Sequence, residues 1–248
     1  MKTFSKLRRS RREEAQTYRQ KNQSLLTPAA TIHSSKNRAI TLLELLVVLA
    51  VLAVLAVIFL PALLKPQPDR ALDIQCANNL KQVGLACRVW EGDHNDKYPP
   101  FVSATNGGSM EYITGTNLWR HFQVMSNEIS TPKVLICPDD DDRNFATNFT
   151  WFNDSNISFF LGIDATDTNP QMILSGDRNI TNGTPVKNGI LTLSTNNPSR
   201  WTKEMHNKVG NVCLADGSLQ QVSIAGLQTT VANTGFTTNR LQMPVLTP

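Results

Sequence analysis

An almost unbroken apolar run covers residues 40–64, and it constrains this chain more than any other feature of the sequence. Only Thr41, Glu44 and Pro61 interrupt the run. As an α-helix, a segment of this length would span about 37 Å, which is enough to cross a bilayer core of roughly 30 Å. The sequence therefore predicts a transmembrane helix over residues 40–64.

The acidic residue inside this run distinguishes it from an ordinary membrane anchor. An unpaired carboxylate in hydrocarbon costs about 2.5 kcal/mol or more at mid-helix, and less near an interface. Glu44 is the fifth residue of the run when Ile40 is counted as the first. A free α-amino group on Ile40 of a neighbouring subunit would be a fitting partner, because the pair would neutralise both charges and set the stagger between two helices. This pairing requires cleavage just before Ile40 and packing of helix against helix.

The charge of the chain is divided between two unlike parts. Residues 1–39 carry ten Lys or Arg and two Asp or Glu, a net charge of +8, and the remaining residues carry fourteen and eighteen, a net charge of −4. A basic head before an apolar helix predicts a cytoplasmic leader, with the globular part of the chain outside the cell membrane. The alternative for the Arg-rich stretch 7–12 is a tail that binds nucleic acid or anionic lipid. We expect no nucleic-acid partner.

An amphipathic pattern follows the apolar run from Asp69 to Glu91. Its apolar positions recur at steps of three and four residues, which is the period of one helix face. These positions are Leu72, Cys76, Leu80, Val83, Cys87 and Trp90. We expect one long helix from about Ile40 to Glu91, with residues 65–96 forming its amphipathic half and ending near Gly92.

The remainder, residues 97–248, is predicted to be a loop-rich β domain outside the membrane. Residues 97–190 indicate loops with short strands and a short helix near Leu118–Met125. Ile190–Leu193 is a strand candidate, and residues 211–222 form two strand-like segments joined by Asp216-Gly217, a strong hairpin signal. The tail after Leu227 is polar. The predicted fold class is α+β, with the long helix packed on an antiparallel sheet.

Two residues near this hairpin could suggest catalysis. A histidine and an aspartate such as His206 and Asp216 can form an acid–base pair, but Asp216 occupies the first central position of the expected tight turn, where Asp favours positive φ. His206 precedes the first strand, and we expect it to pack or hydrogen-bond across the hairpin. Since no Ser or Cys sits in a nucleophile-elbow context, the sequence predicts that the protein is not an enzyme.

The cysteines offer no local metal motif. The chain has no CxxC and no Cys/His cluster with zinc spacing, which argues against a metal site. Cys76 and Cys87 would lie roughly 16 Å apart on one helix, too far for a mutual disulfide. Either could pair with Cys137 or Cys213 in an oxidising compartment, or all four could be small buried hydrophobes.

An acidic run provides the only calcium candidates. It consists of Asp139, Asp140, Asp141 and Asp142. Calcium prefers oxygen ligands at staggered positions, and this run lacks the alternating spacing and the glycine turn of a calcium loop. A solvated acidic loop is the interpretation that we prefer.

The stretch AITLLE followed by LLVVLAVLAVLAVIFLP (residues 39–61) resembles the class III signal of type IV prepilins and type II secretion pseudopilins. The resemblance implies that a prepilin peptidase cuts between Ala39 and Ile40 and that Ile40 becomes N-methylated. It makes Glu44 the acid at mature position five and Pro61 the helix-kinking proline at mature position 22. Two departures concern the cleavage site, where the family usually has Gly and Phe, and the leader, which is long.

The resemblance further implies a pilin-like lollipop fold and a structural role in a type IV pilus or a type II secretion-like pseudopilus. The implied partners are a prepilin peptidase, other pilin or pseudopilin subunits, an inner-membrane assembly platform and membrane lipid. The implied location is the inner membrane, with a single pass, and then the filament. Related pseudopilins can bind calcium in their globular part. The alternative is a signal-anchored extracytoplasmic binding protein that is not assembled into filaments.

A second resemblance concerns the body of the chain. The segments are CANNLKQVGLACRVWEGDHNDKYPP (76–100), LICPDD (135–140), SGDRNI (175–180) and the spacing of His206, nine residues and Asp216-Gly217. Together they resemble large prepilin-like families that are abundant in planctomycete- and verrucomicrobia-type bacteria. These motifs point to a family and imply no biochemical activity.

Overall fold

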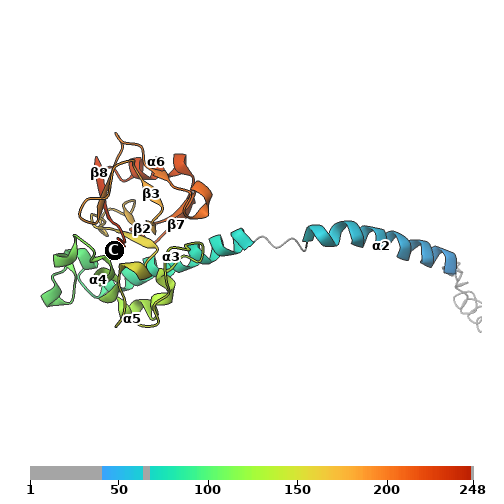
Figure 1. Cartoon of the computed structure of the whole chain (residues 1–248), viewed down its shortest axis with the longest axis horizontal. Coiled ribbons are helices and arrows are strands. Elements are labelled where there is room, and N and C mark those ends of the chain that lie inside the picture. The colour runs from blue at the N-terminus through green and yellow to red at the C-terminus, as the bar shows by residue number, and fades with distance from the viewer. Residues whose placement is uncertain (1–40, 64–67, 247–248) are drawn as a thin grey trace, which may run out of the picture. The chain divides into compact units, whose positions relative to one another are not determined.

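The computed structural model of the protein describes residues 41–63 and 68–246, with the side chains of residues 41–57 and 70–246. The chain divides into two units, Met1–Lys65 and Pro66–Pro248. Figure 1 shows the helices and strands of both units.

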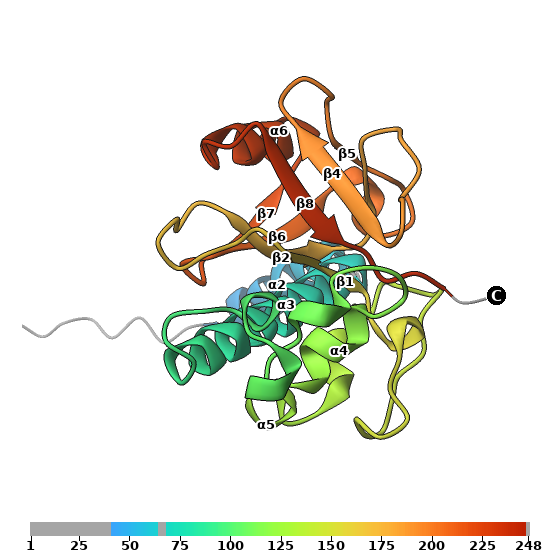
Figure 2. The same cartoon turned by 90° about the vertical axis from the view of Figure 1, so that its left-hand side faces the viewer.

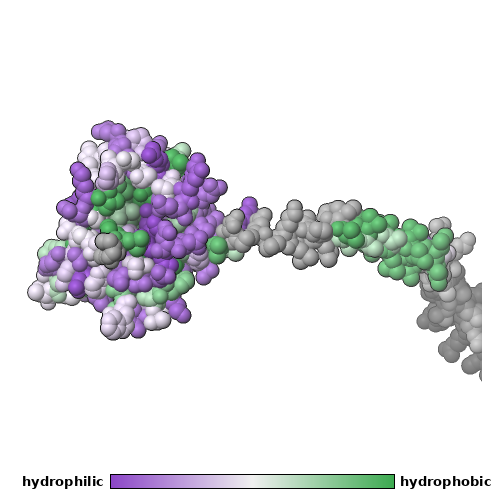
Figure 3. All heavy atoms as spheres, in the orientation of Figure 1, coloured by the Kyte–Doolittle hydropathy of each residue, from purple (hydrophilic) through white to green (hydrophobic). Residues whose placement is uncertain are grey.

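The first unit contains helix α2, Leu42–Leu63. The backbone N–H of Glu44 donates to Thr41 Oγ1 at 3.2 Å, so Thr41 caps the first turn. The described side chains of this helix are exposed and, apart from Glu44, apolar, and the face of α2 seen in Figure 3 is hydrophobic. Within residues 41–63 and 68–246, no helix combines the length and the apolarity that crossing a membrane requires.

The second unit begins with helix α3, Pro68–Gly92. Proline is favoured at a first helical position because its missing N–H would have no partner there. Where the sequence predicted one long helix, the structure describes the two helices α2 and α3. Residues 64–67 between them lie outside the described part of the chain. The predicted apolar stripe is confirmed, because five of its six positions are buried and Leu72 is half-buried.

The core of the second unit is a six-stranded antiparallel sheet with the strand order β4-β8-β1-β2-β6-β7. Its strands are β1 (Phe159–Gly162), β2 (Ile173–Asp177), β4 (Ile190–Ser194), β6 (Gly210–Leu214), β7 (Leu219–Val222) and β8 (Thr238–Gln242). A separate two-stranded sheet pairs β3 (Ile180–Thr181) with β5 (Arg200–Trp201). The predicted α+β class with an antiparallel sheet is confirmed.

The central strands β1, β2 and β6 of the large sheet are buried on both faces. Successive strand residues point to opposite faces, so in β2 Leu174 joins the core against α3, whereas Ile173 joins the core on the other side. Helix α6, Ile224–Asn233, covers this second face with Leu227 and Val231. Figure 2 shows α3 and α6 on opposite sides of β2 and β6.

Short helices fill the long connection between α3 and β1. They include α4 (Leu118–Gln123), which confirms the helix predicted near Leu118–Met125, and α5 (Ser126–Ile129). The segment also contains several 3-10 helices, among them Pro132–Leu135 just before the acidic run. The prediction of loops with short strands and one short helix in this region is thus correct in outline.

The predicted hairpin is confirmed, but its turn differs from the expected one. Strands β6 and β7 pair in register from Gly210 opposite Val222 to Cys213 opposite Leu219. Positive φ falls on Gly217, at 81°, and not on Asp216. The side chain of Asp216 instead accepts a hydrogen bond from the N–H of Ser218 at 2.8 Å. The observed turn is longer than the expected two-residue turn, and it places Gly217 at the position that requires positive φ, which glycine adopts without strain.

The polar tail contributes more structure than its composition indicates. It contains most of α6 and strand β8, which lies inside the sheet between β4 and β1. Two of the buried residues of β8 are the amides Asn239 and Gln242. Gln242 donates to the carbonyl of Tyr112 at 2.9 Å, and its Oε1 lies 2.8 Å from His121 Nε2. Because buried amides that hydrogen-bond within the core replace apolar residues, the alternating pattern of this strand is hidden in the sequence.

Candidate functional site

The predicted processing residues lie at the edge of the described part of the chain. Ala39 and Ile40 fall outside the described residues, whereas Glu44 lies in the first turn of α2 and Pro61 lies within the same helix. The expected partner of Glu44 belongs to a neighbouring subunit, so the single chain does not test this pairing.

The most concentrated group of reactive side chains lies inside the second unit. We call it the His206 cluster and define it by Cys76, Cys137, Asp177 and His206, with Asp73 and Asp139 at its outer edge. Helix α3 contributes Asp73 and Cys76, the segment after the 3-10 helix at residues 132–135 contributes Cys137 and Asp139, and the end of β2 contributes Asp177. His206 comes from a 3-10 turn just before β6.

The four inner side chains of the His206 cluster are linked by a series of pairwise contacts. Cys137 Sγ lies 3.2 Å from His206 Nε2, and the thiol of Cys76 donates to Asp177 Oδ1 at 3.3 Å. Asp177 Oδ2 lies 3.6 Å from His206 Nε2. The side-chain ligand atoms of Cys76, Cys137 and His206 all lie within 4.8 Å of one another. The side chains of all four residues are buried.

The outer carboxylates orient the histidine ring. His206 Nδ1 lies 2.5 Å from Asp73 Oδ1 and 3.4 Å from Asp139 Oδ2. A carboxylate only accepts hydrogen bonds, so the ring donates through Nδ1 to these oxygens. In the neutral ring this arrangement turns the lone pair of Nε2 toward the thiol of Cys137.

The turn that carries His206 has an unusual backbone, which neighbouring residues hold in place. His206–Lys208 has three consecutive positive φ angles of 51°, 44° and 71°, although none of its residues is glycine. This conformation is strained for such residues and persists only where the surroundings stabilise it. Asp139 accepts the backbone N–H of His206 at 2.6 Å. The side-chain amide of Asn179 donates to the carbonyls on both sides of the turn, those of Met205 at 2.9 Å and Val209 at 3.3 Å.

The predicted contact of His206 with the hairpin is therefore replaced by contacts to α3 and to the segment around Cys137. Asp216, its suggested acid–base partner, bonds to its own turn through Ser218. The structure does not bring His206 and Asp216 together as a catalytic pair.

The contacts within the His206 cluster shift the acidities of its members. Burial raises the pKa of Asp177 to about 6, although the charge of His206 opposes this change. Burial lowers the pKa of His206, but the hydrogen bond with Cys137 and the charge of Asp177 raise it more, to about 9. The hydrogen bond from Cys76 lowers the pKa of Cys137, and burial raises the pKa of Cys76. Cys137 is therefore the more acidic of the two thiols.

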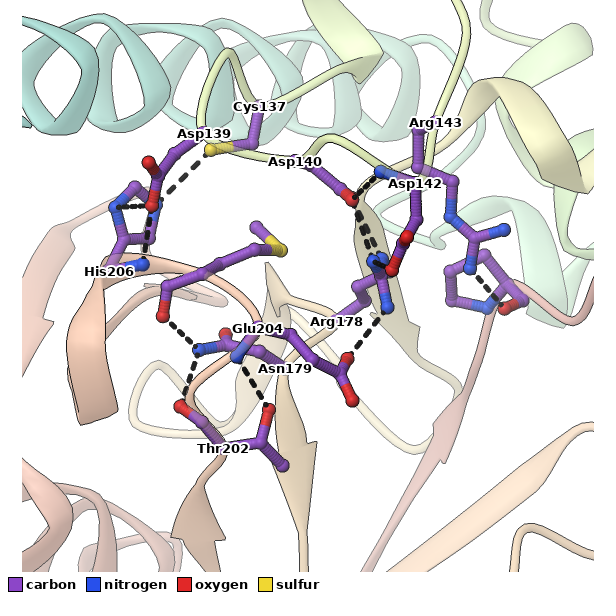
Figure 4. Close-up of polar contacts among 12 residues, drawn as sticks. Cys137, Asp139, Asp140, Asp142, Arg143, Arg178, Asn179, Thr202, Glu204 and His206 are labelled. Carbon is purple, nitrogen blue, oxygen red and sulfur yellow. Dashed lines mark hydrogen bonds and ion pairs between the residues drawn. The ribbon is translucent and has the colours of Figure 1, made fainter.

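A second polar network lies beside the His206 cluster and centres on Arg178, as Figure 4 shows. The guanidinium of Arg178 donates to both carboxylate oxygens of Asp140, with distances of 2.8 Å from Nε and 2.6 Å from Nη2. It also donates to Asp142 and to Glu204, each at 2.9 Å. Two parallel bonds to one carboxylate make this a strong and directional pair.

Three carboxylates of the acidic run form hydrogen bonds or ion pairs with other groups of the same chain. Asp139 accepts the N–H of His206, while Asp140 and Asp142 bind Arg178. Only Asp141 and Asp142 are exposed, and Asp140 is 4% exposed, so the expected solvated loop is only partly correct. Among the described residues, Asp139 is the one member of the run that joins a group able to hold a metal, together with Asp73 and His206. The carboxylates diverge and do not form a calcium loop.

Sequence reasoning missed the residues Asp177, Arg178 and Asn179. Asp177 belongs to the His206 cluster, Arg178 binds the acidic run, and Asn179 binds the turn that carries His206. In the sequence these residues belong to the motif SGDRNI, whose residue types and spacing do not by themselves indicate a binding or catalytic site. The four quoted motifs of the second resemblance all contribute a residue to this region.

A second pair of cysteines lies elsewhere in the core. Cys87 and Cys213 are buried, and the charge of Cys213 contributes to raising the pKa of Cys87, although burial contributes more. Gly84 allows the side chain of Cys213 to lie close to helix α3, because a Cβ at position 84 would lie 2.3 Å from Cys213 Sγ. All four cysteines are free in this structure. Among the described residues, Cys87 and Cys213 belong to no group of three or more metal ligands.

The comparisons with known proteins concern the N-terminal region. Residues 34–60 match the family described as the prokaryotic N-terminal methylation motif. Comparison of the chain with curated proteins and with solved structures finds no match.

The match confirms the first resemblance. Residues 34–60 include the predicted cleavage site and Glu44, so the chain carries the N-terminal motif of prepilin- and pseudopilin-type proteins. The motif implies processing by a prepilin peptidase, association with other pilins and anchoring in the membrane by the N-terminus. The second resemblance, which involves the body of the chain, stays a prediction.

Proposed function

We propose that this protein is a structural subunit of an extracytoplasmic filament, either a type IV pilus or a type II secretion-like pseudopilus. The observation that carries the proposal is the methylation motif over residues 34–60. In this proposal, a prepilin peptidase cuts between Ala39 and Ile40 and methylates the new N-terminus. Residues 1–39 form the cytoplasmic leader, residues 40–64 cross the inner membrane once, and the second unit lies outside.

The surface of α2 supports assembly. Apart from Glu44, its described side chains are apolar, and those from Leu42 (82% exposed) to Leu55 (43% exposed) are exposed in the single chain. Burial of apolar surface is worth about 25 cal/mol per Å², so such a helix requires lipid or other helices around it. Lipid provides this environment before assembly, and the α2 helices of other subunits provide it in the filament.

Helix α3 has a second apolar row that faces away from its sheet. Ile74 and Leu85 are each 63% exposed, and Val89 is 50% exposed. These three positions fall on one side of the helix, because 11 and 4 residues are close to whole numbers of helical turns. We assign this row to contact with a neighbouring subunit.

Glu44 sets the stagger of the subunits in this proposal. Its carboxylate would pair with the N-terminal amine of Ile40 on a neighbouring subunit, so that the two opposite charges neutralise each other within an apolar core. The other partners are the prepilin peptidase, further pilin subunits and an inner-membrane assembly platform.

The mature N-terminus is the first test. The full chain would be expressed with a prepilin peptidase, extracted from the membrane and analysed by intact-mass and terminal-peptide mass spectrometry. We expect a methylated Ile40 terminus. Ala39→Gly should be processed as well as the unmodified chain, and Ala39→Lys should not be cleaved. An intact Met1 terminus on the unmodified chain would instead support the signal-anchored protein that does not assemble.

Assembly is tested separately with variants of Glu44. Glu44→Gln should be cleaved normally but should enter sheared filaments at least about tenfold less, which corresponds to about 1.4 kcal/mol. Glu44→Asp keeps the charge and serves as the matched control, with a smaller loss. Equal incorporation of Glu44→Gln and the unmodified chain would refute the role of this carboxylate.

A further inference from the structure

The His206 cluster gathers four side chains of the types that bind zinc. The chain supplies two thiols, one imidazole nitrogen and one carboxylate oxygen from four separate segments. We propose that the His206 cluster is a structural zinc site with Cys76, Cys137, Asp177 and His206 as its ligands. This site is independent of the N-terminal motif and of the proposed filament function.

The distances between these side chains fit a tetrahedral zinc ion. Zinc bonds of about 2.3 Å to sulfur and about 2.0–2.1 Å to nitrogen or oxygen place tetrahedral ligand atoms about 3.3–3.8 Å apart. The observed separations are 3.2 Å from Cys137 Sγ to His206 Nε2 and 3.3 Å from Cys76 Sγ to Asp177 Oδ1. Cys76, Cys137 and His206 already place their ligand atoms within 4.8 Å of one another, whereas Asp177 stands outside this group and has to turn its carboxylate toward the other three to complete the tetrahedron.

The groups around the ligands hold them as metal ligands are usually held. A zinc-binding histidine normally donates its other ring N–H to a carboxylate, which fixes the tautomer and the ring orientation. His206 does so through Nδ1 with Asp73 at 2.5 Å and Asp139 at 3.4 Å. Asp177 Oδ2 accepts the backbone N–H of Asn211 at 2.6 Å and its side-chain amide at 3.0 Å. The other oxygen, Oδ1, faces Cys76 and is the one available to the ion.

A disulfide between Cys76 and Cys137 is the competing use of these thiols outside the cytoplasm. It would satisfy only the two sulfur atoms. Asp177, which is fully buried, would lose the thiol that now donates to Oδ1, and His206 Nε2 would lose its contact with a free thiol. A buried carboxylate that loses a hydrogen-bond donor is costly. Zinc engages all four groups, and its binding releases the two thiol protons.

Metal content and cobalt substitution test the proposal directly. The full chain would be purified in detergent without chelators, and zinc would be measured by mass spectrometry of the elements. We expect one zinc per chain. After exchange for Co²⁺, we expect the near-ultraviolet charge-transfer band of cobalt bound to thiolate and the intense visible bands of tetrahedral cobalt.

The second cysteine pair provides a matched control. The double substitution Cys76→Ser with Cys137→Ser should abolish zinc binding and the charge-transfer band. The double substitution Cys87→Ser with Cys213→Ser also removes two buried thiols, and it should leave both signals unchanged. Asp177→Asn keeps the thiols, so it should retain the charge-transfer band but shift the visible bands.

Three results would overturn the proposal. The first is a substoichiometric zinc content in the unmodified chain together with Co²⁺ binding that lacks the thiolate band. The second is loss of zinc in the Cys87 and Cys213 double variant alone. The third is a Cys76–Cys137 disulfide in peptide maps of the non-reduced protein. The spectrum of the unmodified chain and its peptide map decide the matter even if a variant fails to fold, and none of these results affects the N-terminal processing test.

Discussion

The buried ion pair of Arg178 predicts a large loss of stability when it is broken from one side. Arg178 is 10% exposed at its side chain, and its bidentate partner Asp140 is fully covered there. Arg178→Met keeps most of the length of the side chain but leaves the Asp140 carboxylate buried without its cation. Removing one partner of a buried pair costs about 3–5 kcal/mol of unfolding free energy. Asp142 and Glu204 add little to this loss, because their side chains are 64% and 53% exposed and return to water.

The chain contains a matched control for this substitution. Arg240 also binds one carboxylate, that of Asp164, through two of its nitrogens, but the side chains are 54% and 24% exposed. Arg240→Met should therefore cost no more than about 1 kcal/mol. Urea unfolding of the full chain in detergent measures both losses through tryptophan fluorescence, since Trp90 and Trp201 are each 2% exposed.

A third variant separates loss of the pair from the cost of an uncompensated charge. In the Arg178→Met background, Asp140→Leu removes the buried carboxylate and should restore most of the lost stability, because an apolar pair often replaces a buried ion pair at little cost. The reasoning is refuted if Arg178→Met loses no more free energy than Arg240→Met, or if the double variant is no more stable than the single one.

Three further predictions concern the core of the second unit. Burial lowers the pKa of His121 to about 4 from its usual 6.5, so the unfolded chain binds a proton before the folded chain does as the pH falls. About 3 kcal/mol of unfolding free energy should therefore be lost between pH 6.5 and 4. Urea unfolding midpoints across this pH range, compared with those of His121→Gln, measure the loss. Gly162→Ala should destabilise the sheet by about 1–3 kcal/mol, because the added Cβ would lie 1.9 Å from a carbonyl oxygen of β2. Gly92→Ala is the control, because open space surrounds this position, and it should not be destabilising. Thermal unfolding compares the two variants. Leu80→Ala should cost about 2–5 kcal/mol in the same urea assay, and Leu85→Ala, on the exposed side of α3, should stay within about 0.5 kcal/mol.

Local patterns in the sequence predicted the elements that depend on local rules. The stripe from Leu72 to Trp90 predicted α3 and its buried face, because helical periodicity is visible over a few turns. The Asp216-Gly217 pair predicted the hairpin, although it did not predict which residue of the turn takes positive φ. The methylation motif was readable because it is a contiguous segment.

The sheet order and the His206 cluster could not be predicted in this way. Strand β8 lies between β4 and β1, and its buried amides Asn239 and Gln242 conceal its alternation. The spacing rules for zinc sites apply to ligands that are neighbours in the sequence. Here Cys76, Cys137 and His206 are brought together by tertiary packing alone, so their separations along the chain carry no signal.

The separation of these residues has a consequence for the order in which the protein reaches its native state. His206 follows Cys76 by 130 residues, so this interior site can close only after about three quarters of the second unit has been synthesised. Contacts that span so much chain carry a loop-closure cost and form late in folding. A chain halted before residue 206 would carry the thiols of Cys76 and Cys137 without the imidazole of His206, which distinguishes an unfinished molecule chemically from a finished one.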